Sequence, residues 1–283
     1  MSSHANTPIL AGVAGWPVGH SLSPLIHNTW AARAGVPGHY VPLAVEPFYE
    51  SFARAMDAAR TLGFKGVNVT IPHKEHALRY AGQASDRAKA AGAANMLTFA
   101  GEGAVADNTD ILGFSAAVRE QSSVPGRTAL VLGAGGAARG IILALKDLGV
   151  EEIFIANRTH KKAQELAETF GGVAINWERR EEALAAIDLL VNTTSLGMTG
   201  EPPLELPLTE LRLGAIVADI VYSPLETRLL KEAAAKGAKT VDGLAMLMHQ
   251  AVPAFEAWFG AKADADAHLR ALLVSALKTR GRS

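Results

Sequence analysis

The glycine-rich stretch at residues 130–140, LVLGAGGAARG, constrains the fold of this chain more than any other part of the sequence. Gly133, Gly135 and Ala138 follow the G-x-G-x-x-A pattern, which has little weight when it stands alone. Here an apolar strand leads into the glycines, and a helical stretch and a second strand follow them. In that setting the glycines permit a tight turn and the close approach of a pyrophosphate to the N-terminus of the helix. The stretch therefore predicts a Rossmann-type domain that binds a dinucleotide, in preference to an ordinary glycine-rich turn.

The end of the second predicted strand indicates which dinucleotide is bound. A domain that binds NAD usually carries Asp or Glu there, and the carboxylate accepts a hydrogen bond from the ribose 2′-hydroxyl. This chain has Asn157, Arg158 and Thr159 instead. A guanidinium can bind a 2′-phosphate through two parallel hydrogen bonds, whereas a carboxylate would repel it. The residues therefore favour NADP, although an arginine at a helix start is by itself more often a solvated surface residue.

Apolar strands alternate with helices along the whole chain of 283 residues, which predicts an α/β fold with mostly parallel sheets covered by helices. A helix for which Asp110 is the candidate N-cap, followed by a loop at 122–126, marks a boundary. We predict a substrate-binding domain at 1–110, an NADP-binding Rossmann domain at 111–242, and C-terminal helices at 243–283 that return to the first domain. The predicted strands of the first domain lie at 9–15, 40–45, 64–71 and 95–99, with a helix at 47–63.

Composition excludes several classes of protein. The formal charge of −1 lacks the basic excess of a nucleic-acid-binding domain. Because the chain has no cysteine, it has no disulfide, thiolate nucleophile or zinc–thiolate site. No apolar run approaches the ~20 residues that span a bilayer, and the N-terminal residues lack the pattern of a secretion signal. We expect a cytoplasmic protein, monomeric or homodimeric, that binds small molecules and contacts neither nucleic acid nor membrane.

Ser21 and Ser23 precede Pro24 at the predicted start of a helix. Two hydroxyls beside the N–H groups of a helix form a neutral cradle suited to a carboxylate. Capping of the helix is the simpler explanation for these two serines. The residues by themselves leave both explanations open.

Other polar residues stand where predicted strands end or loops begin, namely Asn68, Thr70, Lys74, Asn95 and Asp110. Ligand-binding groups collect at such places in open α/β sheets. Lys74 and Asp110 are the pair in this set suited to proton transfer. The N-terminus of a helix disfavours the charged form of Lys74, and a nearby carboxylate opposes that effect. A lysine balanced in this way can exchange a proton with a substrate hydroxyl.

Two alternative chemistries receive less support from the sequence. His73 and His76 stand near a helix start without a third metal ligand close by, so we expect surface histidines and no metal. The serines at 21 and 23 lack the G-x-S-x-G elbow of many serine hydrolases.

Taken together, these residues resemble the shikimate dehydrogenase family over nearly the whole chain. The resemblance rests on nine motifs in the family's order: GHSLSPLIHN, GVNVTIPHKE, GAAN, DNTD, GAGGAARG, ANRT, NTTSLGM, DIVYSPLET and DGLAMLMHQA. It implies that the first domain binds shikimate, that the second binds NADP, and that the enzyme reversibly reduces 3-dehydroshikimate to shikimate with NADPH. That reaction belongs to the biosynthesis of chorismate and the aromatic amino acids.

The resemblance also implies roles for individual residues. Ser21 and Ser23 would bind the substrate carboxylate, and Lys74 and Asp110 would form the catalytic pair, with Lys74 as the proton-transfer group. Contacts with the rest of the substrate would come from Asn68, Thr70, Asn95, Asp110, Tyr222 and Gln250. The dinucleotide would lie against Asp86, Gly133, Ala134, Gly135, Gly136, Ala137, Asn157, Arg158, Thr159, Lys162, Ile220 and Gly243.

Two other functions stay open at this point. A quinate or quinate/shikimate dehydrogenase has the same fold, but quinate carries an extra hydroxyl on the carbon that bears the carboxylate. The pocket at Ser21 and Ser23 would therefore decide between the two substrates. A non-catalytic, NADP-binding regulator on this scaffold would have no need of Lys74 and Asp110.

Overall fold

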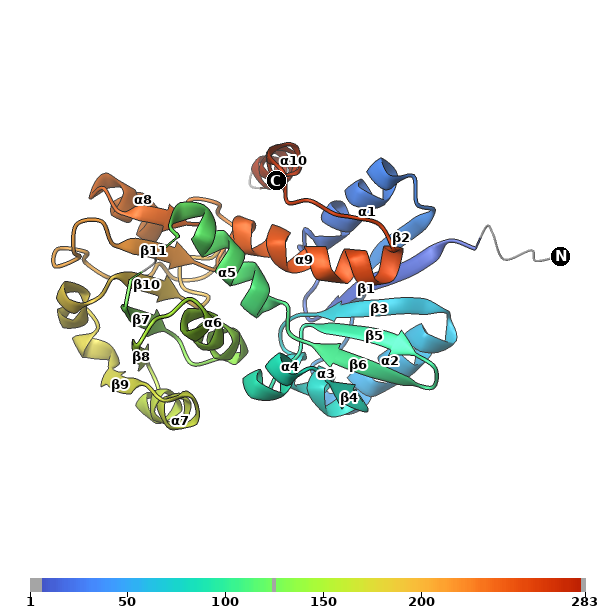
Figure 1. Ribbon diagram of the computed structural model, residues 1–283, viewed down its shortest axis with the longest axis horizontal. Coiled ribbons are helices and arrows are strands. Elements are labelled where there is room, and N and C mark those ends of the chain that lie inside the picture. Colours follow the sequence, from blue (N-terminus) through green and yellow to red (C-terminus); the bar gives the residue numbers. More distant parts are fainter. Residues whose placement is uncertain (1–6, 124–125, 281–283) are drawn as a thin grey trace. The chain divides into compact units, whose positions relative to one another are not determined.

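The computed structural model describes residues 7–123 and 126–280, which form two compact units (Figure 1). Unit 1 contains the residues up to Thr109 and Gln250–Leu273, and unit 2 contains Asp110–His249 and the residues from Val274 onward. The chain passes between the units at the start of α5 (Asp110–Gln121) and within α9 (Gly243–Phe259) and α10 (Ala267–Arg280). Most of the N-terminal stretch, and two residues of the loop at 122–126, lie outside the described residues.

Unit 1 is built on a six-stranded mixed sheet in the order β2-β1-β3-β5-β6-β4. β1 runs parallel to β2 and β3, whereas β5 runs antiparallel to β3 and β6. The four strands predicted for this part of the chain are present, but the β5–β6 hairpin is not predicted, because β6 consists mainly of small residues with weak strand propensity. The strands are β1 (Ile9–Gly15), β2 (Gly38–Ala44), β3 (Phe64–Val69), β4 (Gln83–Ala84), β5 (Met96–Ala100) and β6 (Gly103–Asp107).

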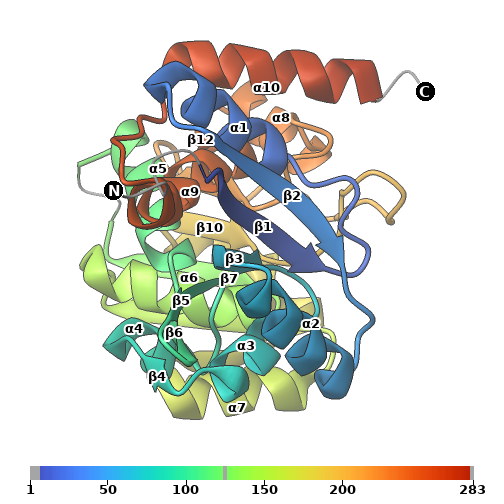
Figure 2. The ribbon, with the colours of Figure 1, turned by 90° about the vertical axis from the view of Figure 1, so that its right-hand side faces the viewer.

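Helices cover both faces of this sheet. On one face α2 (Tyr49–Thr61), α3 (Lys74–Tyr80) and α4 (Asp86–Ala91) pack over an apolar core. The spacing in α2 buries Phe52 and Met56, whereas Phe48 precedes the first turn and is exposed. The other face carries α1 (Ser23–Ala34) and the C-terminal half of α9, and Figure 2 shows α1 and α2 on opposite sides of β1 and β2.

Aromatic rings fill the layer between α1, α9 and the sheet. Trp258 of α9 lies so close to β3 that a Cβ on Gly66 would come within 2.2 Å of its ring, so this strand position accepts only glycine. His27 of α1 lies at the centre of this layer, with its ring parallel to that of Tyr40 and near those of Phe255 and Trp258. Both ring nitrogens of His27 are buried without a hydrogen-bond partner among the described residues.

Unit 2 is a doubly wound α/β unit with a six-stranded parallel sheet in the order β12-β11-β10-β7-β8-β9. Its strand order reverses at β7, as expected of a dinucleotide-binding fold. The strands are β7 (Thr128–Leu132), β8 (Glu152–Asn157), β9 (Val173–Asn176), β10 (Leu189–Asn192), β11 (Ile216–Asp219) and β12 (Lys239–Val241). The helices that lie wholly within unit 2 are α5, α6 (Gly136–Asp147), α7 (His160–Phe170) and α8 (Arg228–Ala235), with 3₁₀ turns η1 (Trp177–Arg179) and η2 (Glu182–Ala186).

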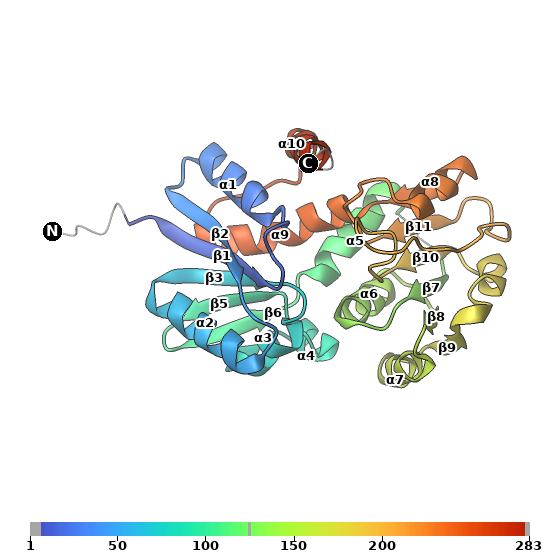
Figure 3. The same ribbon diagram turned by 180° about the vertical axis from the view of Figure 1, so that it is seen from behind.

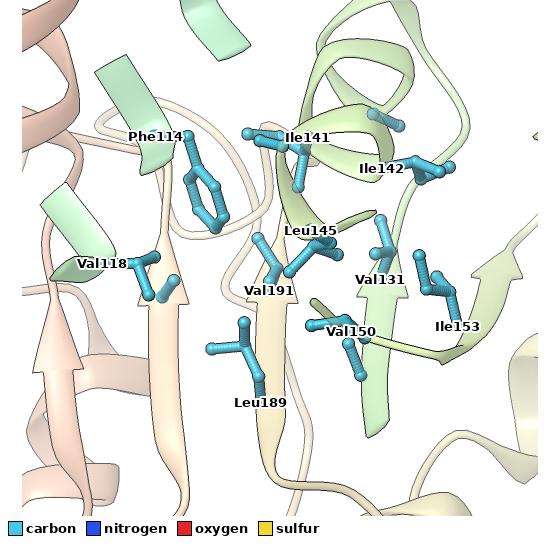
Figure 4. Close-up of a cluster of buried hydrophobic side chains, with 14 of the residues drawn as sticks. Phe114, Val118, Val131, Ile141, Ile142, Leu145, Val150, Ile153, Leu189 and Val191 are labelled. Carbon is cyan, nitrogen blue, oxygen red and sulfur yellow. The ribbon is translucent and has the colours of Figure 1, made fainter. Parts of the chain in front are cut away.

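Each face of the parallel sheet has its own core, because successive side chains of a strand point to opposite faces. α5, α6 and α7 cover one face, and Figure 4 shows side chains of α5 and α6 beside those of β7 and β10. η2 and α8 cover the other face, and Figure 3 shows this unit from the side opposite to Figure 1. None of the described helices is long and apolar enough to cross a bilayer.

We expect acid to destabilise unit 1 through His27. Burial lowers the pKa of this imidazole from 6.5 to about 3, so the folded chain keeps it neutral while the unfolded chain takes up a proton. The stabilisation is therefore complete above the unfolded pKa and is lost as the pH falls toward 3. From pH 7.5 to pH 5 the free energy of unfolding should fall by about 2 kcal/mol through this group.

Denaturant unfolding at both pH values, followed by the fluorescence of Trp30 and Trp258, measures this loss. His27→Phe should remove most of it, whereas His39→Phe, at an exposed position of β2, should leave it in place. Equal acid sensitivity in the wild type and the His27→Phe variant would show that His27 is not the group responsible.

Candidate functional site

A buried hydrogen-bond network in unit 1 centres on the side chain of Asn95. Asn95 Oδ1 accepts from the backbone N–H of Thr109 at 2.7 Å, so the other end of the amide must be Nδ2. Asn95 Nδ2 donates to Thr109 Oγ1 at 3.0 Å and to Gln250 Oε1 at 3.1 Å. The network therefore joins the residue before β5, the residue before α5 and a residue of α9. All three side chains are at most 8% exposed.

Asn68 extends this network along β3. Its Nδ2 donates to the backbone oxygen of Asn95 at 3.1 Å, and its Oδ1 accepts from the hydroxyl of Tyr40 at 2.8 Å. Thr70, two residues further on, is half-buried where the chain leaves the strand. The structure thus brings together three of the predicted substrate-binding residues, namely Asn68, Asn95 and Gln250.

The predicted catalytic residues begin two different helices. Lys74 is the first residue of α3, and its backbone oxygen accepts from the N–H of Ala94 at 2.9 Å, next to Asn95. Asp110 is the first residue of α5 rather than its N-cap, it is buried, and it directly follows Thr109. Asn95 therefore links the backbone that carries Lys74 to the residue that precedes Asp110.

The two predicted carboxylate ligands stand at the start of α1. The N-cap residue is Leu22, which has no capping side chain, and Ser21 Oγ accepts from the N–H of Ser23 at 3.2 Å. That bond uses the Ser21 oxygen as an acceptor and leaves its hydroxyl hydrogen for a ligand. Helix capping and ligand binding are therefore compatible roles for Ser21.

The prediction that His73 lies at the surface is wrong. The residue is fully buried at the start of α3, where its Nε2 bonds to the backbone oxygen of Val45 at 2.8 Å. Because that oxygen can only accept, Nε2 carries the hydrogen and Nδ1 accepts from Nδ1 of His76 at 3.1 Å. Burial is the main cause that lowers the pKa of His73. Sequence spacing could not reveal this position, because Val45 belongs to a distant loop.

The glycine loop of unit 2 has the shape that a dinucleotide requires. Gly133 has φ +107° and lies against Thr193, where an added Cβ would come within 2.6 Å of the hydroxyl oxygen. Gly135 and Gly136 differ, because an added Cβ would meet nothing within 4 Å. The backbone at the N-terminus of α6 is therefore open to a pyrophosphate, with the half-buried Ala134 and Ala137 on either side of the two glycines. These residues fit the predicted NADP.

The loop after β8 lies beside the glycine loop, since the N–H of Gly133 donates to the backbone oxygen of Ala156 at 2.8 Å. Asn157 Nδ2 donates to the backbone oxygen of Thr159 at 3.0 Å and holds the turn. Arg158 is exposed, and its side chain makes no hydrogen bond or ion pair with the residues that the structure describes. Its guanidinium is therefore available to a phosphate, with the exposed Lys162 one helical turn further on.

The other predicted cofactor residues of unit 2 meet where β11 ends. A Cβ on Gly243 would lie 2.3 Å from the backbone oxygen of Ile220, so the start of α9 touches the loop after β11. Tyr222 follows in the same loop, and burial raises the pKa of its hydroxyl. Asp86 belongs to unit 1, where it is fully exposed on the first turn of α4 and lies 3.8 Å from Lys89.

The polar group that holds this loop is Asp219, which the sequence motifs did not indicate. Asp219 ends β11 and is 2% exposed. Its carboxylate accepts from Asn192 Nδ2, from Thr227 Oγ1 and from the N–H of Val221, at 2.8–3.0 Å. Burial raises its pKa to about 6, and these hydrogen bonds oppose the rise. The only sequence signal is the position of Asp219 and Asn192 at the ends of neighbouring strands.

The two glycines of the loop should respond differently to alanine. Gly133→Ala places a Cβ against Thr193 at a positive φ, so we expect more than about 1 kcal/mol of destabilisation. Gly135→Ala should fold normally, because its Cβ enters open space, but should weaken NADP binding by about tenfold or more. Thermal unfolding and calorimetric titration separate the two effects, and a Gly135→Ala protein that binds NADP like the wild type would contradict the assignment.

Comparison with known proteins covers nearly the whole chain. Family models match at residues 13–97 (shikimate dehydrogenase substrate binding domain), 115–198 (shikimate / quinate 5-dehydrogenase) and 243–273 (shikimate 5′-dehydrogenase C-terminal domain). The shikimate dehydrogenase (NADP(+)) of Acidiphilium cryptum (strain JF-5) is 51% identical over 261 residues, which are 92% of each chain.

Solved structures extend this similarity to the fold. Shikimate 5-dehydrogenase from Thermus thermophilus, in complex with NADP(H) and shikimate, has a TM-score of 0.84 at 35% identity, over 93% of this chain and 98% of its own. Quinate dehydrogenase from Corynebacterium glutamicum, in complex with NAD, has a TM-score of 0.88 at 31% identity, over 95% of this chain and 100% of its own. The predicted two-part α/β fold and the predicted resemblance are confirmed, and the chain belongs to the shikimate dehydrogenase family.

Proposed function

We propose that this chain catalyses the reversible, NADP(H)-dependent interconversion of 3-dehydroshikimate and shikimate, with the substrate bound in unit 1 and the dinucleotide in unit 2. The observation that carries the proposal is the buried network of Asn68, Asn95 and Gln250, which is linked through the backbone to Lys74. A set of buried amides suits a small ring that carries several hydroxyls, because each hydroxyl needs a directed partner.

The carboxylate of the substrate is assigned to the serines at the start of α1. Ser21 offers its hydroxyl hydrogen, whereas the Ser23 hydroxyl bonds to Tyr40 and would turn to the carboxylate when the substrate binds. Hydroxyls bind a carboxylate without adding a charge. The ring hydroxyls are assigned to the amides and to Thr70, and Tyr222 of unit 2 stays a predicted substrate-binding residue.

Lys74 is assigned the proton transfer. When it is bound, NADPH supplies the hydride that reduces the substrate carbonyl carbon. The Lys74 ammonium donates a proton to the carbonyl oxygen, which becomes a hydroxyl, and Lys74 then regains a proton from solvent. In the oxidative direction the neutral amine accepts the hydroxyl proton. The Asp110 carboxylate is assigned to hold the lysine and the hydroxyl in line, as its position after Thr109 supports.

The dinucleotide is assigned to the two adjacent loops of unit 2. The backbone N–H groups of Gly135 and Gly136 would donate to the pyrophosphate, and Arg158 would bind the 2′-phosphate with help from Thr159 and Lys162. Ile220 and Gly243 would lie against the nicotinamide. We also propose that Asp86 lies near the cofactor. The three predicted domain ranges, a monomeric or homodimeric state and a cytoplasmic location are part of the same proposal.

Removal of the Lys74 amine should slow the chemical step. We expect Lys74→Ala to lower kcat by roughly 10²-fold or more, the usual scale for a general acid–base group, with a smaller change in the KM for shikimate. Lys65→Ala is the matched control, because Lys65 is an exposed lysine of β3. Steady-state rates of NADP reduction make the comparison, and a fully active Lys74→Ala enzyme would remove the proposed role.

Substrate and cofactor preference test the proposal as a whole. Initial rates with shikimate or quinate, each with NADP or NAD, should be high for shikimate with NADP alone. Arg158→Asp should shift the ratio of kcat/KM values toward NAD, because its carboxylate repels a 2′-phosphate and accepts from a 2′-hydroxyl. Arg179→Asp, at an exposed arginine elsewhere in unit 2, should leave the ratio unchanged.

The same assay distinguishes the alternatives. Activity with quinate would favour the second candidate, a quinate/shikimate dehydrogenase. The similarity to the Corynebacterium quinate dehydrogenase is the reason for testing it. NADP binding without activity on either substrate would favour the non-catalytic regulator. An unchanged cofactor ratio in Arg158→Asp would show that Arg158 does not bind the phosphate.

A further inference from the structure

His27 and Asn28 belong to the motif GHSLSPLIHN, and the proposed function gives neither of them a role. Both lie on α1, and both hold Tyr40 of β2. Asn28 Nδ2 donates to the backbone oxygen of Tyr40 at 2.9 Å, and Asn28 Oδ1 accepts from its N–H at 2.8 Å. The imidazole of His27 stacks on the phenol, with centroids 4.0 Å apart and planes 7° from parallel. The phenol is therefore fixed at its backbone and at its ring face.

The hydroxyl of Tyr40 meets a side chain of the proposed substrate site. It lies 2.8 Å from Asn68 Oδ1, at the end of Asn68 opposite to the backbone oxygen of Asn95. The Asn95 oxygen can only accept, so Asn68 must present its NH₂ group to it. The end that faces Tyr40 is then the carbonyl oxygen, which can only accept, so Tyr40 must be the donor.

This assignment fixes the orientation of the Asn68 amide. Its carbonyl oxygen accepts from Tyr40, and one of its two amide hydrogens is donated to Asn95, so one N–H remains. Burial raises the pKa of Tyr40 well above its ordinary value, and a hydrogen bond from the Ser23 side chain opposes part of the rise. The phenol therefore keeps the hydrogen that it donates to Asn68 at neutral pH.

We infer that Tyr40 is a positioning residue for the substrate, which holds the Asn68 amide so that Asn68 offers an N–H donor to a substrate oxygen. The inference rests on the proposed function, because it gives that oxygen to a ring hydroxyl or carbonyl of the substrate.

Removal of the Tyr40 hydroxyl tests the inference. Tyr40→Phe should raise the KM for shikimate by about tenfold, while the KM for NADP changes little. In a double-mutant cycle, adding Tyr40→Phe to the Asn68→Ala variant should change the KM for shikimate by less than about twofold, because the Tyr40 hydroxyl acts through Asn68. Tyr80→Phe is the matched control, since the Tyr80 hydroxyl donates to Asp57 at 2.8 Å, away from this network.

A second variant, Asn68→Asp, tests whether the substrate meets the NH₂ group of Asn68, and it does so even if Tyr40→Phe fails to fold. Asn68→Asp replaces the NH₂ group by an oxygen, and we expect it to weaken shikimate binding at least as much as Asn68→Ala. Wild-type affinity in Asn68→Asp would overturn the inference, as would a Tyr40→Phe enzyme with an unchanged KM for shikimate. Effects of Tyr40→Phe and Asn68→Ala that multiply in the double variant would also overturn it.

The wild type separates this inference from the proposed function. A wild-type protein that does not oxidise shikimate would overturn both. If the wild type and the Tyr80→Phe control are active and Tyr40→Phe leaves the KM for shikimate unchanged, only the inference is overturned.

Discussion

The amide of Asn95 is the interaction on which the rest of unit 1 depends. Its backbone N–H donates to Asp107, and its backbone oxygen accepts from Val69, so the residue joins the ends of β6 and β3. Its side chain adds Thr109 and Gln250. A buried amide that loses a partner costs about 1–3 kcal/mol, so each of these segments is held in one place. The proposed substrate site is the surface that these segments share.

In the glycine loop of unit 2, close backbone contacts have the role that side-chain amides have in unit 1. Parallel strands bring their carboxyl ends to one edge, and close approach of the chain there depends on glycine. Gly133 meets Thr193 and Gly243 meets Ile220, both at distances that exclude a Cβ. The open backbone at Gly135 stands beside these tight contacts. A phosphate site needs exposed N–H groups at a helix N-terminus that are held in place by the surrounding chain. These groups must point outward before the ligand binds.

The local features of the chain could be predicted with good accuracy. The strand at 9–15 and the helix that begins at Asp110 lie where the apolar pattern places them, and the glycine loop stands between β7 and α6 as its motif requires. The loop of Asn157, Arg158 and Thr159 after β8 could be predicted in the same way. Each of these features depends on residues close together in sequence, so periodicity and turn chemistry are sufficient to find it.

What the sequence by itself determined is the α/β class, the dinucleotide loop and the identity of the polar residues that surround a small-molecule site. The tertiary structure decided how those residues are oriented. The burial of His73, the polarity of Asn68 and the stacking of Tyr40 on His27 each depend on segments that are distant in sequence. Hydrogen-bond donors and acceptors acquire a direction only when their partners are in place, and packing of the helices on the sheet brings those partners together.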